Sequence, residues 1–249
     1  MCHGEHERKG TTMGNRAVIT DRDKRVGVYL HWNGGRHSVE AFLKYCKLRG
    51  FRTGDYGWAR LCQVIGNFFG GGLSVGIDTL DHLDCDNGDN GMYVMDGWEL
   101  VDHLYDEPCE DGYDVDELVM EIDSCQPQSE QLGHYLRAVE VPVSELRVGD
   151  VVWMEQHDGE RVPYEVVGFG DDENLCFGEY VGVPYTSAYG KDNPNSYVRG
   201  KTCKVCPEES RGAMIAASRE YMRRHDEWMR RPLVCRHPNF NEILHELGY

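Results

Sequence analysis

Basic residues are absent from a long stretch of this sequence. Residues 61–136 contain no Lys or Arg, yet the same 76 residues hold 18 Asp and Glu. The stretch therefore carries a formal charge of −18 against −17 for the whole chain, so the remaining residues sum to +1. Acidity localised in this way predicts a partner that is positive, or one that normally binds something negative.

Two further absences limit the class of protein. No apolar run approaches the roughly 18 residues of a membrane span, so no membrane association is expected. The N-terminus has no charged-then-apolar signal peptide, and the ten Cys are therefore expected to be reduced thiols in a cytoplasm. A net charge of −17 also argues against direct nucleic-acid binding, since such binding normally needs a basic surface.

The fold class predicted for the first part of the chain is α+β. Residues 1–12 are polar and patternless, which predicts a disordered leader with Met1 or Met13 as the start. Residues 13–104 are predicted to form a small, mostly antiparallel sheet with two helices. The expected strands are 16–20, 26–32, 73–77, 92–95 and 98–101, and the helices are 39–49 and a second one that Asp55 caps.

Residues 86–91, with the sequence DNGDNG, resemble a calcium loop at first sight. The EF-hand spacing fails in either register, because oxygen ligands and glycine do not fall at the required positions. We therefore predict a hairpin connection, for which Asn, Asp and Gly supply backbone conformations with positive φ.

The most acidic segment, residues 105–140, is predicted to be a helical connector. Asp114 and Glu117 form a D-x-x-E capping box before an apolar run, which indicates a short helix. The carboxylates in and near this segment are the candidate binding residues: Asp102, Asp106, Glu107, Glu110, Asp111, Asp114, Asp116, Glu117, Glu121 and Asp123.

The second half of the chain divides into two predicted parts. Residues 141–153, with a Gly149-Asp150 turn before an apolar strand, resemble the entry to an SH3-like small β-barrel, which we place at residues 141–200. Residues 201–249 are predicted to be helical, with a long helix over 208–230 and a short one over 241–247. Apolar pairs recur every seven residues at Met214, Tyr221 and Trp228, which predicts a packing seam on the long helix.

Few residues carry a signature of chemistry. His31, at a strand end beside residues 33–35 (NGG), is the catalytic candidate, and a structural histidine is the competing interpretation. Cys203 and Cys206 have zinc-knuckle spacing, and Cys235 with His237 would complete a set of four ligands. No cofactor is expected apart from this alternative of a structural zinc, because idle thiols explain the same cysteines.

Residues 13–20 (MGNRAVIT), 28–35 (VYLHWNGG), 65–71 (IGNFFGG) and 86–91 (DNGDNG) carry a resemblance. Together they resemble an uncharacterised family of proteins from bacteria, phages and mobile elements. The resemblance covers residues 13–104, and it implies a bacterial host cytoplasm and an accessory role. It implies no established activity and no catalytic residue.

Three functions are consistent with these observations. The first is a non-enzymatic binding protein of phage or mobile-element origin, whose carboxylates mimic nucleic-acid phosphates and inhibit a host nucleic-acid-handling or defence machine. An ordinary solvated acidic surface, whose charge aids solubility or docks on the chain's own basic C-terminal helix (residues 208–230), explains the same charge. The second is a small enzyme with a site at His31. The third is a zinc-stabilised adaptor that uses the helix seam as an interface.

Overall fold

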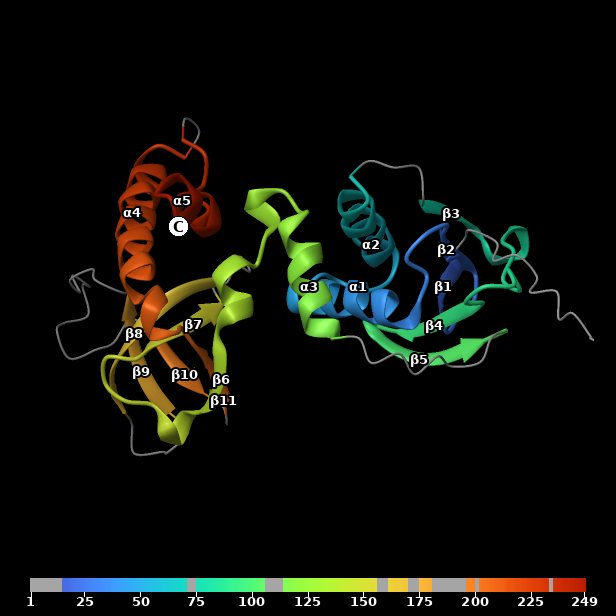
Figure 1. Cartoon of the computed structure of the whole chain (residues 1–249). Coiled ribbons are helices and arrows are strands. Elements are labelled where there is room, and N and C mark those ends of the chain that lie inside the picture. Colours follow the sequence, from blue (N-terminus) through green and yellow to red (C-terminus); the bar gives the residue numbers. More distant parts are fainter. Residues whose placement is uncertain are drawn as a thin grey trace, which may run out of the picture. The chain divides into compact units, whose positions relative to one another are not determined.

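The computed structural model describes residues 15–70, 75–105, 114–155, 161–169, 175–180, 196–199, 202–232 and 235–249 of the chain. These residues form an α+β protein, whose elements are shown in Figure 1. The chain divides into two compact units, Met1–Gln126 and Pro127–Tyr249. The predicted leader, residues 1–12, lies outside the described residues.

The first unit contains a mixed five-stranded sheet. Its strands are β1 (Ala17–Asp21), β2 (Val26–Leu30), β3 (Val75–Thr79), β4 (Met92–Asp96) and β5 (Glu99–Leu104). The spatial order is β3-β2-β1-β4-β5, and the neighbours are antiparallel except for β1 and β4, which run parallel. Because nearly every residue of β1 and β4 is buried, both faces of the sheet are covered at its centre.

Three helices pack together beside this sheet: α1 (Arg36–Leu48), α2 (Asp55–Phe68) and α3 (Val115–Ser124). α1 contacts α2, α3 and β5, and α2 contacts β3 (Figure 1). The helix predicted at residues 39–49 is confirmed as α1, which buries an apolar face that includes Val39, Phe42 and Cys46. The predicted cap of α3 is also confirmed. The Asp114 carboxylate accepts hydrogen bonds from the backbone N–H groups of Asp116 (2.9 Å) and Glu117 (3.3 Å).

The predicted hairpin at residues 86–91 is wrong. β3 pairs with β2, whereas β4 pairs with β1 and β5, so the chain crosses the sheet between β3 and β4 instead of turning back. The turn residues do adopt the expected conformations, with φ of +70° at Gly88 and +60° at Gly91. A turn signal fixes the local backbone, but it does not determine which strands become neighbours.

The second unit contains a six-stranded antiparallel sheet. Its strands are β6 (Val139–Pro142), β7 (Val151–Glu155), β8 (Arg161–Phe169), β9 (Leu175–Tyr180), β10 (Ser196–Arg199) and β11 (Thr202–Val205). The order is β10-β9-β8-β7-β11-β6, and within the described residues the end strands β10 and β6 do not pair with each other. The Gly149-Asp150 turn does precede β7, but the structure does not confirm a closed barrel.

Two helices complete the second unit: α4 (Arg211–Arg230), preceded by a 3₁₀ turn at Glu208–Ser210, and α5 (Phe240–Glu246). The first steps of the predicted seam are confirmed as packing positions, since Met214 and Tyr221 are buried. They pack in the core of the same unit, where the Phe240 ring meets Tyr221 and Trp153 edge-on at 6.2 and 5.7 Å. The far end of the seam is exposed, with Met229 62 % exposed.

The boundary between the units lies inside the segment that was predicted to be a connector. Helix α3 belongs to the first unit because Gln126, just after it, is tied to α2. The Gln126 amide donates to the carbonyl of Val64 at 3.1 Å and accepts from Asn67 at 2.9 Å. Gln126 is buried, so these bonds fix the end of α3 firmly on the helical layer.

Candidate functional site

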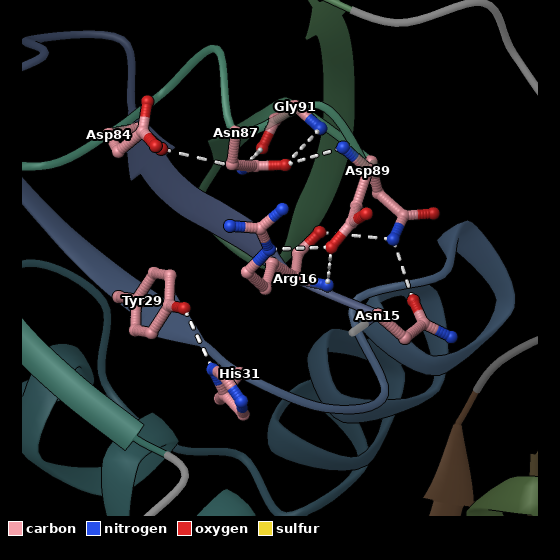
Figure 2. Close-up of polar contacts among 9 residues, drawn as sticks. Asn15, Arg16, Tyr29, His31, Asp84, Asn87, Asp89 and Gly91 are labelled. Atoms are coloured by element: carbon pink, nitrogen blue, oxygen red, sulfur yellow. Dashed lines mark hydrogen bonds and ion pairs between the residues drawn. The ribbon is translucent and has the colours of Figure 1, made fainter. Parts of the chain in front are cut away.

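Three segments that are far apart in the sequence meet on the first unit. They are the entry to β1, the end of β2 with the residues that follow it, and the 84–91 loop (Figure 2). The Gly34 N–H donates to the carbonyl of Asn15 at 2.7 Å, and the Asn90 N–H donates to that of Arg16 at 3.1 Å. We call the side chains gathered here the polar cluster. Its members are Arg16, Tyr29, His31, Asp84, Asn87 and Asp89.

Asn87 organises the 84–91 loop from within. Its side chain is 5 % exposed, and its amide nitrogen donates to the carbonyl of Gly91 at 3.0 Å. Its amide oxygen accepts from the N–H groups of Asp89 (3.1 Å) and Gly91 (3.2 Å). With a longer bond from its amide nitrogen to the carbonyl of Asp84 at 3.4 Å, this one side chain bonds four backbone groups of a segment that belongs to no strand. Gly91 is required beside it, because a Cβ there would overlap the carbonyl oxygen of Leu104.

The loop presents Asp89 to Arg16. The Asp89 carboxylate accepts from Arg16 Nε at 2.6 Å and from the Arg16 backbone N–H at 3.1 Å. The Asp89 side chain is only 10 % exposed, against 30 % for Arg16. The hydrogen bond from the Arg16 side chain lowers the pKa of Asp89 below its ordinary value, so the pair is ionised at neutral pH.

The terminal nitrogens of Arg16 remain available. Within the part of the chain that the structure describes, neither Nη1 nor Nη2 makes a hydrogen bond or an ion pair. Figure 2 draws no contact from either nitrogen, and both lie beyond Nε, below Asp84 and Asn87 in the view. The charge of Arg16 is therefore partly balanced, while four of its five N–H donors stay unused.

Tyr29 lies on β2, and His31 follows just after the end of this strand. Both lie on the same side of the chain as Arg16 (Figure 2). The Tyr29 hydroxyl and His31 Nδ1 are 3.0 Å apart, which is hydrogen-bond distance. His31 is exposed and meets the ring of Trp32 edge-on at 4.9 Å, and Trp32 is itself 42 % exposed. The predicted catalytic candidate is thus a solvent-accessible histidine in a polar setting and is not buried in the core.

A separate cleft lies between α1 and α3. Its volume is about 330 Å³. Carboxylates of α3 form one wall, the start of α1 forms the other, and Phe68 and Leu118 contribute apolar surface. The lining residues are Asn33, His37, Ser38, Phe68, Asp114, Glu117, Leu118 and Glu121. A cleft with both carboxylates and apolar surface suits a ligand that has an aliphatic part and a cationic end.

The predicted acidic binding residues do not form one continuous surface. Asp114, Glu117 and Glu121 line the cleft, whereas Asp116 forms an ion pair with Lys44 at 2.5 Å. Asp123 is buried and accepts from the Tyr45 hydroxyl at 3.0 Å, so it is a structural residue.

Other members of that set lie elsewhere. Asp102 is exposed on β5, where its carboxylate accepts from the neighbouring N–H of His103. Four further candidates fall outside the described residues, namely Asp106, Glu107, Glu110 and Asp111.

The structure does not bring the predicted zinc ligands together. Among the described residues, which include Cys203, Cys206, Cys235 and His237, no three His, Cys, Asp or Glu form a group that could hold a metal ion. Cys206 instead belongs to the core of the second unit, and burial raises the pKa of its thiol to about 12. His237 packs edge-on against Trp228 at 4.6 Å, which accounts for its position without a metal.

Sequence reasoning missed Arg16, Asn87 and Asp89 as site residues. The DNGDNG pattern was a sufficient signal for an ordered polar loop, but its partner lies more than 70 residues earlier in the chain. A lone Arg at a strand start gives no indication of such a pairing.

The described residues contain no helix that is long and apolar enough to cross a membrane. No protein-family model matches the chain, and no curated protein or solved structure is significantly similar to it.

Proposed function

We propose that this protein is a non-enzymatic binding protein that holds a basic segment of a protein partner in the cleft between α1 and α3. One observation carries the proposal. Carboxylates of α3 line a cleft of about 330 Å³ together with the apolar side chains of Phe68 and Leu118. Lys and Arg side chains have the matching construction, a hydrocarbon stem that ends in a cation.

The charges of α3 support a ligand from outside the unit. Asp116 is already paired with Lys44, but Glu117 and Glu121 are exposed and form no ion pair with any residue in the described ranges. Their carboxylates lie three and seven residues after the cap Asp114, so all three share one face of the helix. A cation in the cleft would therefore meet several acceptors at once.

We propose further that the partner is a protein that handles nucleic acids, in keeping with a phage or mobile-element protein that inhibits a host defence or nucleic-acid machine. Arg and Lys side chains that bind phosphates also pair with carboxylates, so an acidic ridge can occupy a groove built for a phosphate backbone. The SH3-like resemblance of residues 141–153 agrees with a binding role, because such folds mostly bind.

The cleft can be tested with a fluorescent oligo-arginine peptide and anisotropy measurements on the full chain. We expect the double variant Glu117→Gln/Glu121→Gln to weaken binding by about tenfold or more, the loss expected for charge-assisted contacts. The matched control is Asp86→Asn/Asp102→Asn, which removes two exposed carboxylates outside the cleft. It should weaken binding by less than about twofold. If both double variants lose the same peptide affinity, the carboxylates form an ordinary solvated acidic surface, and the cleft is not the binding site.

The partner class needs a separate experiment. The tagged protein is used to capture host nucleic-acid-binding proteins at low and at high salt. A mimic of phosphates should retain such proteins at low salt and release them at high salt. Capture of none, or of proteins that bind regardless of salt, would contradict this part of the proposal.

A small enzyme with a site at His31 is the second candidate. One observation favours it over a structural histidine: His31 is exposed, lies 3.0 Å from the Tyr29 hydroxyl and is close to Arg16. Imidazole next to phenol is an arrangement that can transfer a proton. The binding function is preferred, because the cleft has both a volume and a defined chemical character.

A further inference from the structure

The polar cluster contains a guanidinium that is fixed in place while most of its donors are unused. Arg16 is held through Nε and its backbone N–H by Asp89, and its carbonyl accepts from both the N–H and the side chain of Asn90. An Arg held in this way has little side-chain entropy left to lose when it binds a ligand. We infer that Arg16 and Tyr29 form a second binding site, which takes a compact oxyanion such as a carboxylate or a phosphate ester.

The geometry of the donors supports this ligand class. The Nη1 and Nη2 groups lie beyond the Nε that bonds Asp89, and together they offer the planar fork that matches two oxygens of an oxyanion (Figure 2). The Tyr29 hydroxyl adds a further donor when His31 carries its proton on Nδ1. In that tautomer His31 donates to the phenol oxygen across the 3.0 Å contact, which leaves the phenol hydrogen for a ligand.

Nearby carboxylates limit which anions can bind. Asp89 balances the charge of Arg16, and the exposed Asp84 is close enough to raise the pKa of Arg16 further, after the larger effect of Asp89. Long-range attraction of an anion is therefore weak, and binding depends on the short contacts of the fork. Polyanions such as nucleic acid are excluded by the same charges, whereas a small oxyanion can reach the fork.

This site is independent of the proposed cleft. No cleft-lining residue belongs to the polar cluster, and the two ligands have opposite charge. Loss of peptide binding in the cleft variants would leave oxyanion binding at Arg16 unchanged, so the two proposals can fail separately.

The test is a titration of the full chain with inorganic phosphate and, separately, with N-acetylglycine as a simple carboxylate. It is followed by the NMR signals of the Arg16 side chain and the Gly91 amide. We expect saturable shifts with at least one probe. Phosphate alone would identify a phosphate ester as the natural group, and N-acetylglycine alone would identify a carboxylate.

Three variants with different expected signs make the test specific. Tyr29→Phe should weaken binding about threefold through loss of one hydrogen bond. Arg16→Lys should weaken it by about tenfold, because an ammonium lacks the fork. Asp84→Asn should tighten it about threefold by removing a repelling charge, a gain that misfolding cannot produce.

Arg22→Lys is the matched control. Arg22 also pairs through Nε with an aspartate, Asp96 at 2.7 Å, but this pair is exposed on both sides. We expect no change in oxyanion affinity for this variant. Absence of saturable shifts with both probes, an effect of Arg22→Lys equal to that of Arg16→Lys, or no tightening in Asp84→Asn would each overturn the inference.

Discussion

The 84–91 loop and helix α3 are both rich in carboxylates, and both lie in the stretch without Lys or Arg, but they use their charge differently. In the loop, Asp89 is 10 % exposed and binds Arg16 of the same unit. In α3, Glu117 and Glu121 are exposed and face a cleft. Charge density along a sequence therefore does not tell whether a carboxylate holds the fold together or is available to a partner.

The physical reason for the difference is the backbone. An α-helix satisfies the N–H and C=O groups of its interior, so the backbone of α3 needs a side chain only at its cap, where Asp114 accepts two N–H groups. The 84–91 loop is not part of a strand, so its backbone groups are satisfied partly by the backbone of Arg16 and Val18 and partly by a side chain. Asn87 supplies the side-chain bonds within the loop and Asp89 ties the loop to Arg16, which explains why polar residues there are part of the structure.

The largest effect is expected from a substitution that disrupts the 84–91 loop. Gly91→Ala should reduce the free energy of unfolding of the first unit by about 3 kcal/mol or more, because the new Cβ would overlap a carbonyl oxygen at a position with φ +60°. Hydrogen exchange of the amides of β1 and β4 measures this unit alone. Gly88→Ala is the matched control, since φ is +70° there but no atom lies within 4 Å of the added Cβ. Gly88→Ala should lower the free energy of unfolding by about 1 kcal/mol. Similar losses at both positions would show that the overlap is relieved.

A smaller effect is expected at Asp89. Asp89→Asn should lower the free energy of unfolding by about 2 kcal/mol at neutral pH, because a largely buried charge-assisted hydrogen bond is weakened. The pKa of Asp89 is lowered in the folded state, so its contribution is complete above the ordinary pKa of an aspartate. The contribution is lost as pH falls below that value. The difference in stability between wild type and variant, followed by urea titration, should therefore shrink towards zero in acid. A difference that stays constant down to about pH 2 would contradict the assigned ion pair.

The smallest effect is expected at Asp116. This residue pairs with Lys44 at 2.5 Å, but their side chains are 74 % and 41 % exposed. Asp116→Asn should therefore change the free energy of unfolding by no more than about 0.5 kcal/mol, as solvent screens such pairs. The same measurement as for Asp89→Asn compares one chemical change in the two regions. A loss at Asp116 as large as that at Asp89 would remove the distinction between loop and helix.

Much of the secondary structure could be predicted from local patterns. The helix predicted at residues 39–49 is α1 (Arg36–Leu48), and the cap at Asp114 does begin α3. Both rest on interactions within a few residues, namely an apolar stripe and a side chain that bonds its own helix end. The seam at Met214 and Tyr221 was recognisable for the same reason, although its packing partner within the second unit was not.

The candidate sites depended on contacts that sequence patterns do not contain. Arg16 and Asp89 lie 73 residues apart, and Tyr45 and Asp123 lie 78 apart. Tertiary folding also decided that Asp123 is buried while Glu121, two positions earlier, is exposed. In a helix, two residues correspond to about 200° of rotation, so carboxylates two positions apart can lie on opposite sides of the helix, one facing the core and one facing solvent.

The sequence by itself determined where charge is concentrated, which segments form amphipathic helices and where the backbone adopts positive φ. These properties follow from composition and from the periodicities of 3.6 and two residues. Only the tertiary structure decided that β1 and β4 run side by side and that the 84–91 loop binds Arg16. It also decided which carboxylates of α3 line a cleft. The reason is that strand neighbours and long-range ion pairs depend on how the whole chain buries its apolar surface, which no local pattern specifies.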